Sequence, residues 1–486
     1  MNWFSGDIQA VGYPVSRNSL RIVEHMKNLA LVVLFSVCSL GQRTAPITSP
    51  SINNTLFVGG SGMAAGADIG VQITNAYRSC PTTGCKIHVL AGNYSFSTTI
   101  NLNSAVPVSL ECDSGANGLT STSGSTQLIY KGSGTAMIFA SGGFTGGGME
   151  GCTLTGPGTG GSTTGLLIAG SVGYLFQMND ISNFNIGVQL GPVSGVANSI
   201  LDFKHLFIGG SVHDNGQNLV TGNGSDESNV FVGVLFSSQA NGFNPACIQL
   251  GNSSGSNVYP TEVSFIGGSA DQCGITISNP SSRVRFTDFH LENPVAATKN
   301  DFITVAANCL GCTVSLTDTD IYENFNGAGR TQMISINTTG TMHFSLVNGQ
   351  FYAGREAPVT DLVKINGGNN LVTVEPLYLN GITHPLSPHT GIAIATMMPG
   401  NLTVGDYAST AQLDQQGDVV QSGVPFARLN ATPVVGMTQF CTNCVPTTPS
   451  ACATNSPASC VCKAGTGSMW AKYENFMNNG ANWYCH

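Results

Sequence analysis

The chain has 486 residues, a formal net charge of −9 at pH 7 and only 9 % charged residues. Because 41 % of its residues are hydrophobic, the composition excludes an intrinsically disordered chain, in which low hydrophobicity accompanies high charge. The few basic residues form no stripe, and the glycine-rich runs lack the lysine and following helix of a phosphate-binding loop. We therefore expect no nucleic-acid partner.

The first predicted element is a secretory signal peptide over residues 1–41. A charged start at Met26 and Lys27 precedes the short apolar run of residues 29–40, and small residues before Gln42 suit cleavage there. The run is too short to span a bilayer, so we do not expect a membrane-spanning protein. We predict a secreted, extracellular protein, with the periplasm or the cell surface as alternatives. Met26 is the favoured translation start, and a long segment before the apolar run is the other option.

Residues 42–85 are predicted to form a lead-in and an N-terminal cap. Asp68 can cap a short helix in which Ile69, Ile73 and Tyr77 share one face. The terminal coil of a solenoid would otherwise expose its apolar core and unpaired strand edges. We expect this helix to cover that end of the fold.

A repeated pattern between residues 263 and 352 predicts the architecture. Each copy has two apolar residues two apart, then Gly, Asp or Asn, then another apolar residue three positions later. Equivalent positions at Phe265, Phe286, Leu316 and Leu346 are separated by 21, 30 and 30 residues. A unit of this size is typical of a solenoid, in which each coil buries its apolar face against its neighbours. Earlier copies fit at residues 206–213 and 230–236.

The turn position of these copies holds Gly267, Asp288, Asp318 and Asn348. Gly, Asn and Asp tolerate the left-handed backbone that a sharp turn between strands requires. Stacked strands with their turns in register make a parallel β-helix. We therefore predict an all-β fold, a right-handed parallel β-helix of about eleven coils over residues 86–395, on the order of 50 Å long.

The C-terminal part is predicted to differ from the coils. Residues 396–430, rich in Gly, Gln, Asp and Thr, are interpreted as a linker, and residues 431–486 as a small cysteine-rich module. Disulfides are favoured over zinc there, because the segment would be exported and one cysteine pair has the wrong spacing for a zinc knuckle. Trp470 and Trp483 either stack on sugar rings or fill a small core. Six cysteines lie in this module: Cys441, Cys444, Cys452, Cys460, Cys462 and Cys485.

The other cysteines indicate disulfides within the coils. Cys38 falls in the signal peptide, and the even number that remains of the 15 cysteines suits an oxidising compartment. We expect two local pairs and two pairs between successive coils: Cys80 with Cys85, Cys309 with Cys312, Cys247 with Cys273, and Cys112 with Cys152.

The N-terminal elements resemble a known superfamily. Residues 68–77, the segment Lys86–Tyr94 and residues 98–102 are similar to the first elements of the pectate-lyase-like superfamily, in which a capping helix leads to a strand ending in a Pro-Ala-Gly-x-Tyr-type turn. Leu90 stands where that superfamily usually has proline. It includes pectin-degrading enzymes and phage tailspike depolymerases. The resemblance implies the β-helix fold and a polysaccharide partner, but it does not fix the reaction.

Active-site signatures from the superfamily do not carry over to this chain. The Asn-Thr-Asp, Asp-Asp, Gly-His-Gly and Arg-Ile-Lys motifs of polygalacturonase-like enzymes are all missing from the sequence. Calcium-dependent pectate lyases use an acidic cluster beside a catalytic Arg or Lys, and no residues of this sequence are assigned to such a cluster. We predict no metal and no cofactor, with Ca²⁺ possible if the protein is a lyase.

Polar residues concentrate on the strands that follow the turn. Asp271 and Glu292 share one column of the alignment, and His290 and Asp320 share the next. Adjacent coils lie about 4.8 Å apart and residues two apart on a strand about 6.5 Å, which brackets the spacing of paired carboxylates in glycosidases. Crowded acids also raise one another's pKa, as a general acid requires. We predict Asp271, Glu292 and Asp320 as the acid and base set, assisted by His290 and Glu323.

Four further residues are predicted to bind substrate: Tyr322, Tyr352, Arg285 and Arg355. The alternative for the whole set is an exposed polar face of a soluble protein, and His205, His213 and Asp214 form a weaker second cluster. The negative net charge disfavours a strongly polyanionic substrate. Two functions remain open: a secreted protein that cleaves a neutral or mildly acidic polysaccharide as hydrolase or lyase, and a non-catalytic adhesin or glycan-binding protein. The oligomeric state is not predicted.

Overall fold

The computed structural model describes residues 54–61, 63, 66–103, 106–113, 126–140, 144–170, 172–191, 201–221, 225–239, 242–251, 260–293, 300–323, 331–353, 359–368, 370–387, 394–398, 401–404, 411–414, 419–421, 438–441, 444–446, 462–464, 469–476 and 480–485. The predicted signal peptide lies outside these residues. Within them, no helix is long and apolar enough to cross a membrane.

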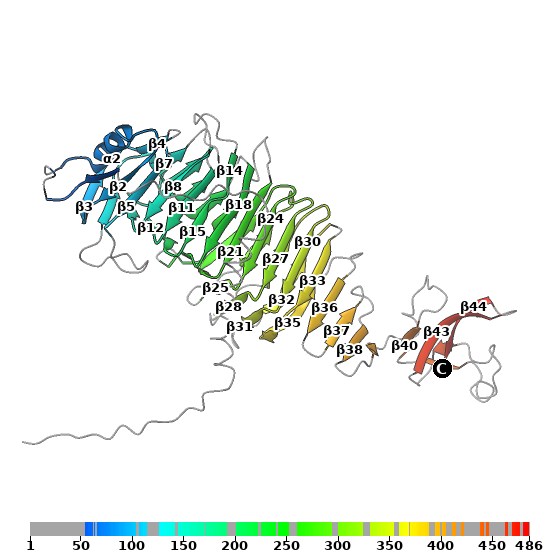
Figure 1. Cartoon of the computed structure of the whole chain (residues 1–486). Coiled ribbons are helices and arrows are strands. Elements are labelled where there is room, and N and C mark those ends of the chain that lie inside the picture. The colour runs from blue at the N-terminus through cyan, green and yellow to red at the C-terminus, as the bar shows by residue number, and fades with distance from the viewer. Residues whose placement is uncertain are drawn as a thin grey trace, which may run out of the picture. The chain divides into compact units, whose positions relative to one another are not determined.

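Three parallel sheets make up most of the described chain (Figure 1). The strands of the first sheet that pair in parallel are β1 (Thr55–Val58), β2 (Cys85–Val89), β5 (Val108–Cys112), β8 (Phe144–Glu150), β11 (Val172–Gln177), β14 (Leu201–Phe203), β15 (Leu206–Ile208), β18 (Ser225–Val232), β21 (Thr261–Ile266), β24 (Arg283–Thr287), β27 (Thr313–Thr317), β30 (His343–Val347), β33 (Leu371–Glu375) and β36 (Ile394–Met398).

The second and third sheets have eleven described strands each. The second sheet contains β3 (Gly92–Phe96), β6 (Thr126–Tyr130), β9 (Thr153–Thr155), β12 (Asp180–Ser182), β16 (Ser211–His213), β19 (Leu235–Ser237), β22 (Ser269–Asp271), β25 (His290–Asn293), β28 (Asp320–Glu323), β31 (Gln350–Ala353) and β34 (Tyr378–Asn380). The third contains β4 (Ile100–Asn103), β7 (Thr135–Ala140), β10 (Thr164–Ala169), β13 (Ile186–Leu190), β17 (Gln217–Thr221), β20 (Asn244–Leu250), β23 (Cys273–Ile277), β26 (Ile303–Val305), β29 (Gln332–Ile336), β32 (Val359–Ile365) and β35 (Ile382–Ser387).

The order of these strands along the chain defines the fold. Beginning at β2, the chain visits the first, second and third sheets in turn and then returns to the first, one strand further along. Every strand therefore pairs with its counterpart one coil away, and all of these pairs are parallel, as in β21 with β24 and β22 with β25. The predicted parallel β-helix is confirmed, and the fold is nearly all β.

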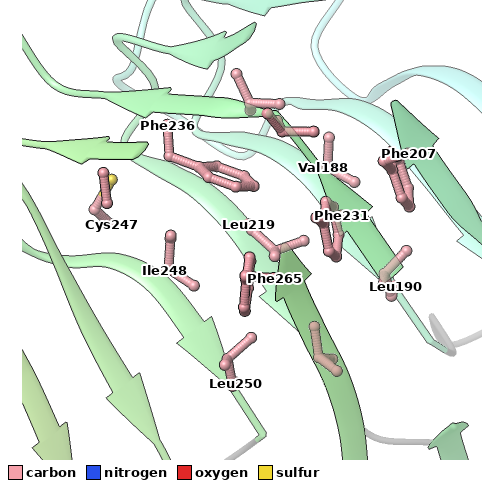
Figure 2. Close-up of a cluster of buried hydrophobic side chains, with 14 of the residues drawn as sticks. Val188, Leu190, Phe207, Leu219, Phe231, Phe236, Cys247, Ile248, Leu250 and Phe265 are labelled. Carbon is pink, nitrogen blue, oxygen red and sulfur yellow. The ribbon is translucent and has the colours of Figure 1, made fainter. Parts of the chain in front are cut away.

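The register predicted from the repeats is also confirmed. Phe265 pairs with Phe286, which pairs with Leu316, which pairs with Leu346. The earlier copies supply Phe207 and Phe231 at the same position. These side chains point inward and are almost completely buried. Figure 2 shows several of them together with apolar residues from the third sheet, among them Leu219, Ile248 and Leu250.

Aromatic rings form a continuous stack in this core. The rings of Phe207 and Phe231 lie 4.4 Å apart with an interplanar angle of 11°, and those of Phe265 and Phe286 lie 5.0 Å apart at 6°. These distances are close to the spacing between neighbouring strands, about 4.8 Å. The coil spacing thus places one ring directly above the next, which buries a large apolar area and favours this register.

The turn between the first and second sheets has the left-handed backbone that was predicted. Its φ angles are 62° at Gly267, 52° at Asp288, 53° at Asp318 and 62° at Asn348. The residue after Gly267 is constrained as well, because a Cβ at Gly268 would lie 2.3 Å from the carbonyl oxygen of Val234.

Met178 occupies the same turn one coil before Gly209, and its φ is 50°. A left-handed conformation costs an ordinary L-residue about 1–2 kcal/mol. We expect Met178→Asn to raise the free energy of unfolding by about 1 kcal/mol, measured by denaturant titration. The reciprocal change, Asn348→Met, should lower it by at least as much, since the Asn348 side chain also donates a hydrogen bond to Asp318. A Met178→Asn protein no more stable than the parent would contradict this account.

The helix α2 (Ile69–Arg78) lies beside the first strands at the N-terminal end of the coils (Figure 1). Its N-cap is Asp68, as predicted, and Ile69, Ile73 and Tyr77 are buried against the core. One Asp68 oxygen accepts from the backbone of Val71 and the other from the backbones of Ser97 and Thr98. Burial opposes ionisation of Asp68, but these hydrogen bonds together lower its pKa. The same carboxylate therefore caps the helix and fixes the next strand connection.

All four predicted disulfides within the coils are present. Two close short loops, between Cys80 and Cys85 and between Cys309 and Cys312, and two join successive coils, between Cys112 and Cys152 and between Cys247 and Cys273. Cross-links of this kind restrict the unfolded chain and are typical of proteins from oxidising compartments.

The first sheet continues beyond β36 in a different way. The strands β37 (Asn401–Val404), β38 (Ala411–Asp414) and β39 (Val419–Gln421) extend it by antiparallel pairing, within the region that the sequence indicated as a linker. Further along, β40 (Thr438–Cys441), β43 (Met469–Phe476) and β44 (Gly480–Cys485) form one antiparallel sheet, and β41 (Cys444–Pro446) pairs with β42 (Cys462–Ala464). The cysteine pairing predicted for residues 431–486 lies outside the described side chains.

Candidate functional site

The candidate site lies on the outer face of the second sheet. Strand alternation turns Ala270, Leu291, Ile321 and Phe351 into the core, where each is fully buried, so the residues on either side of them face outward. Two columns of outward side chains result. The first contains Ser269, His290, Asp320 and Gln350, and the second contains Ser237, Asp271, Glu292, Tyr322 and Tyr352.

The carboxylates predicted for catalysis occupy neighbouring positions of these columns. Asp271 pairs directly with Glu292, and His290 pairs directly with Asp320. The Nε2 atom of His290 lies 3.5 Å from Oε2 of Glu292, and Oδ1 of Asp320 accepts a hydrogen bond of 3.2 Å from the backbone of Gln350. The local β-structure therefore brings three carboxylates and one imidazole onto three adjacent coils.

Two of these acids are held partly out of water. Burial raises the pKa of Asp271, and the neighbouring Glu292 adds to this, while the Ser269 hydroxyl and His290 act in the opposite direction. Oδ1 of Asp271 is buried without a hydrogen-bond partner. Burial also raises the pKa of Asp320, opposed by its hydrogen bond from Gln350 and by His290. A carboxyl group with a raised pKa keeps its proton closer to neutral pH, which is the property of a general acid.

An aromatic surface borders the acidic residues. The ring of His290 lies 5.4 Å from that of Tyr322, and the rings of Tyr322 and Tyr352 lie 5.8 Å apart at an interplanar angle of 30°. Both tyrosines are half-buried, so part of each ring faces solvent. Flat aromatic faces of this kind can pack against the apolar faces of sugar rings.

Other predicted site residues are placed elsewhere. Glu323 lies on the same side of β28 as the buried Ile321, is 5 % exposed, and accepts a 3.0 Å hydrogen bond from the side chain of Asn293. Arg285 lies on β24 of the first sheet, where it is exposed and 3.4 Å from Glu262. Neither residue therefore joins the acidic columns. Arg355 lies outside the described residues.

A second polar cluster lies further toward the N-terminus on the same outer face. Nε2 of His213 is 2.9 Å from Asp180, and its Nδ1 is 2.9 Å from Asp214. The Ser211 hydroxyl donates to the same Asp180 oxygen at 2.6 Å. The sequence suggested His213 and Asp214 but missed Asp180. Asp180 lies in the same column as Ser211, which continues the column of Ser269 and His290 toward the N-terminus, so extending the alignment of the repeats would have identified it. His205, the third member suggested, is instead fully buried, stacks on Tyr174, and has a pKa lowered by burial to about 3.

The two aspartates make His213 a pH-dependent stabilising residue. The hydrogen bond to Asp180, opposed by burial and reinforced by Asp214, raises the pKa of His213 from 6.5 to about 9. The folded protein then holds this proton more tightly than the unfolded chain. The stabilisation is complete below pH 6.5 and is lost as the pH rises through about 9.

We therefore expect the stability difference between the parent and His213→Gln to fall by about 3 kcal/mol as the pH is raised across this range. Denaturant titrations at several pH values would measure it. A difference that stays constant with pH would show that His213 contributes only packing.

Within the part of the chain that the structure describes, no group of three or more His, Cys, Asp or Glu side chains is arranged to hold a metal ion.

Comparison with known proteins finds no matching family model and no matching curated protein. Solved structures do match. A protein titled ORF18 of Geobacillus virus E2 is 12 % identical, with 86 % of this chain and 73 % of that chain covered and a TM-score of 0.39. An alginate lyase from Paenibacillus sp. is 11 % identical, with coverages of 69 % and 98 % and a TM-score of 0.38. The tailspike gp49 of Acinetobacter baumannii bacteriophage Fri1, described as a capsular polysaccharide depolymerase, is 14 % identical, with coverages of 70 % and 65 % and a TM-score of 0.40.

The candidate site is defined by the geometry of this chain. The fold itself rests on the strand pairing: three parallel sheets, visited in turn by successive coils, make this chain a parallel β-helix protein.

Proposed function

We propose that this chain is a secreted polysaccharide-cleaving protein whose site is the outer face of the second sheet between β22 and β31. The observation that carries the proposal is the direct pairing of Asp271 with Glu292, beside His290 and Asp320 in the next column. The backbones of Asp271 and Glu292 are about 4.8 Å apart on neighbouring coils, which suits a pair of carboxyl groups on either side of a glycosidic bond.

Each side chain is given a role by its surroundings. Asp271, whose pKa is raised by burial, would donate a proton to the leaving oxygen. Glu292, with His290 at 3.5 Å, would act either as the nucleophile that attacks the anomeric carbon or as the base that activates a water molecule. Asp320 would contact substrate hydroxyls, and Tyr322 and Tyr352 would pack against the next sugar ring.

The substrate is proposed to be a neutral or only mildly acidic glycan. Three carboxylates on adjacent coils would repel a polymer with an acid on every sugar. Incubation of the purified protein with a panel of neutral, mildly acidic and strongly acidic polysaccharides tests this, scoring both new reducing ends and unsaturated ends. Reducing ends alone would indicate hydrolysis, and unsaturated ends would indicate a lyase.

A non-catalytic glycan-binding function is the second candidate, favoured by the stacked tyrosines. The same panel separates the two functions if binding is measured beside cleavage. Tight binding without any new chain ends would support the binding function, and neither binding nor cleavage of any polymer would overturn both.

A further inference from the structure

The described strands of the second sheet carry acids without any Lys or Arg, whereas the first sheet, which is also acidic, mixes Glu111, Glu150, Glu227, Glu262 and Glu375 with Lys86, Arg283 and Arg285. The eleven described strands of the second sheet contain five carboxylates and two histidines but no Lys or Arg. The lysines and arginines on described strands of the coils lie on the other two sheets: Lys86, Arg283, Arg285 and Lys364.

The border of the candidate site adds more negative charge. Asp288 and Asp318 lie in the turns that lead directly into β25 and β28. Burial raises the pKa of Asp288, and the charge of Asp318 adds to this effect, so the two carboxylates repel each other. Lys131 directly follows β6, five strands before β22 in the sheet, and so lies well away from the site. In the described part of the chain, this face therefore carries its carboxylates without a Lys or Arg beside them, and its basic side chains are the histidines His290 and, further toward the N-terminus, His213.

Two buried polar atoms in the second column have no hydrogen-bond partner. Ser237 is only 3 % exposed, and its Oγ has no partner. It pairs directly with Asp271, whose Oδ1 is also buried without a partner. An ammonium group supplies three hydrogen-bond donors and a positive charge, both of which suit a carboxylate such as Asp271.

We propose that the glycan bound on this face carries protonated amino groups, as in a polymer of partly or fully deacetylated amino sugars. This inference rests on the proposed cleavage at this face, and it replaces the neutral or mildly acidic glycan considered above with a basic one. Clefts lined by charges of one sign concentrate ligands of the opposite sign, and the attraction weakens as salt is added. A cationic glycan would thus meet attraction along the whole row from Asp271 to Asp320, whereas a uronic-acid polymer would meet repulsion.

The test measures binding separately from cleavage. A neutral glucan is compared with its aminated and carboxymethylated forms at equal substitution, using the Glu292→Gln protein so that the polymers stay intact. The aminated form should bind about ten-fold tighter than the neutral form at about 0.01 M salt, and the carboxymethylated form should bind more weakly than both. The difference should largely disappear at about 1 M salt, where the Debye length falls to about 3 Å.

A matched pair of variants locates the attraction. In the same background, Asp320→Asn should weaken binding of the aminated polymer by about three- to ten-fold. Glu150→Gln removes one charge from an exposed position on the first sheet and should change binding by less than about two-fold. Equal losses in both variants would show a general effect of the net charge of −9 and would overturn the inference.

Other outcomes separate the two proposals. Neutral and aminated polymers that bind equally well at low salt would overturn the inference while leaving the proposed cleavage intact. If the aminated polymer is preferred but the unmodified protein cuts none of a panel of amino-sugar and neutral polymers, the charge inference would stand and the proposed cleavage would fail.

Discussion

Glu292→Gln is expected to lower the rate of polysaccharide cleavage by about 10²–10⁴-fold. The substitution keeps the size of the side chain but removes the charge that faces His290 at 3.5 Å and Asp271 on the preceding coil. A carboxamide can neither attack an anomeric carbon nor take a proton from water, so either role that we assign to Glu292 is lost. Initial rates of chain-end release, measured on the best substrate of the panel, would give this ratio.

The pH profile separates this role from that of Asp271. Because burial raises the pKa of Asp271, its proton should be retained to higher pH, and its loss should set the alkaline limb of the parent's pH–rate profile. Asp271→Asn should reduce the rate and remove that limb, whereas Glu150→Gln on the first sheet should leave rate and profile unchanged. A Glu292→Gln protein that keeps at least half of the parental rate would contradict the site assignment.

Periodicity made the coils predictable from the sequence. Phe265, Phe286 and Leu316 had to share one position, because a shift of one residue would turn every inward side chain outward. The turn residues Asp288 and Asn348 gave the same register independently, since few residue types accept a positive φ. Where the turn residue breaks this rule, as at Met178, pattern alone gave no signal.

The columns of the site were predictable for the same reason. Alignment of the repeats paired Asp271 with Glu292 and His290 with Asp320, and the strand pairing confirms both pairs. Alternation would also have excluded Glu323, because it is two residues after the inward Ile321.

Charge at the site was harder to anticipate. Arg285 comes only five residues before His290 in the sequence, yet the turn at Asp288 puts it on a different sheet. The contact between His213 and Asp180 joins residues more than thirty positions apart, and it follows only from the pairing of β12 with β16. The spacing of residues in the sequence gives their position along a strand, but the location of the turn between two sheets determines which charged side chains become neighbours.

Phe265→Ala is expected to lower the free energy of unfolding by about 3–5 kcal/mol, the range for removing a buried phenylalanine. The side chain is fully buried, and its ring lies 5.2 Å from that of Phe231 and 5.0 Å from that of Phe286. The ring of Phe236, on β19 of the second sheet, meets the ring of Phe265 edge-on at an interplanar angle of 78°. Loss of the ring would leave a cavity that borders three coils. The backbone hydrogen bonds between neighbouring strands hold the coils at a fixed spacing, so they cannot move together to fill it.

Denaturant unfolding of the purified protein would measure the change, with Phe265→Leu as the intermediate case at about 1–2 kcal/mol. Phe57→Ala is the matched control. Because Phe57 is 66 % exposed, this substitution should change the free energy of unfolding by less than about 0.5 kcal/mol. In a solenoid each coil is stabilised mainly by its neighbours, so the loss should spread to the coils of β18 and β24. Hydrogen exchange should therefore quicken at Phe231 and Phe286 but not at the distant β5 of the same sheet. A loss below about 1 kcal/mol would mean that the stacked rings contribute little, and the register would then depend on the turns instead.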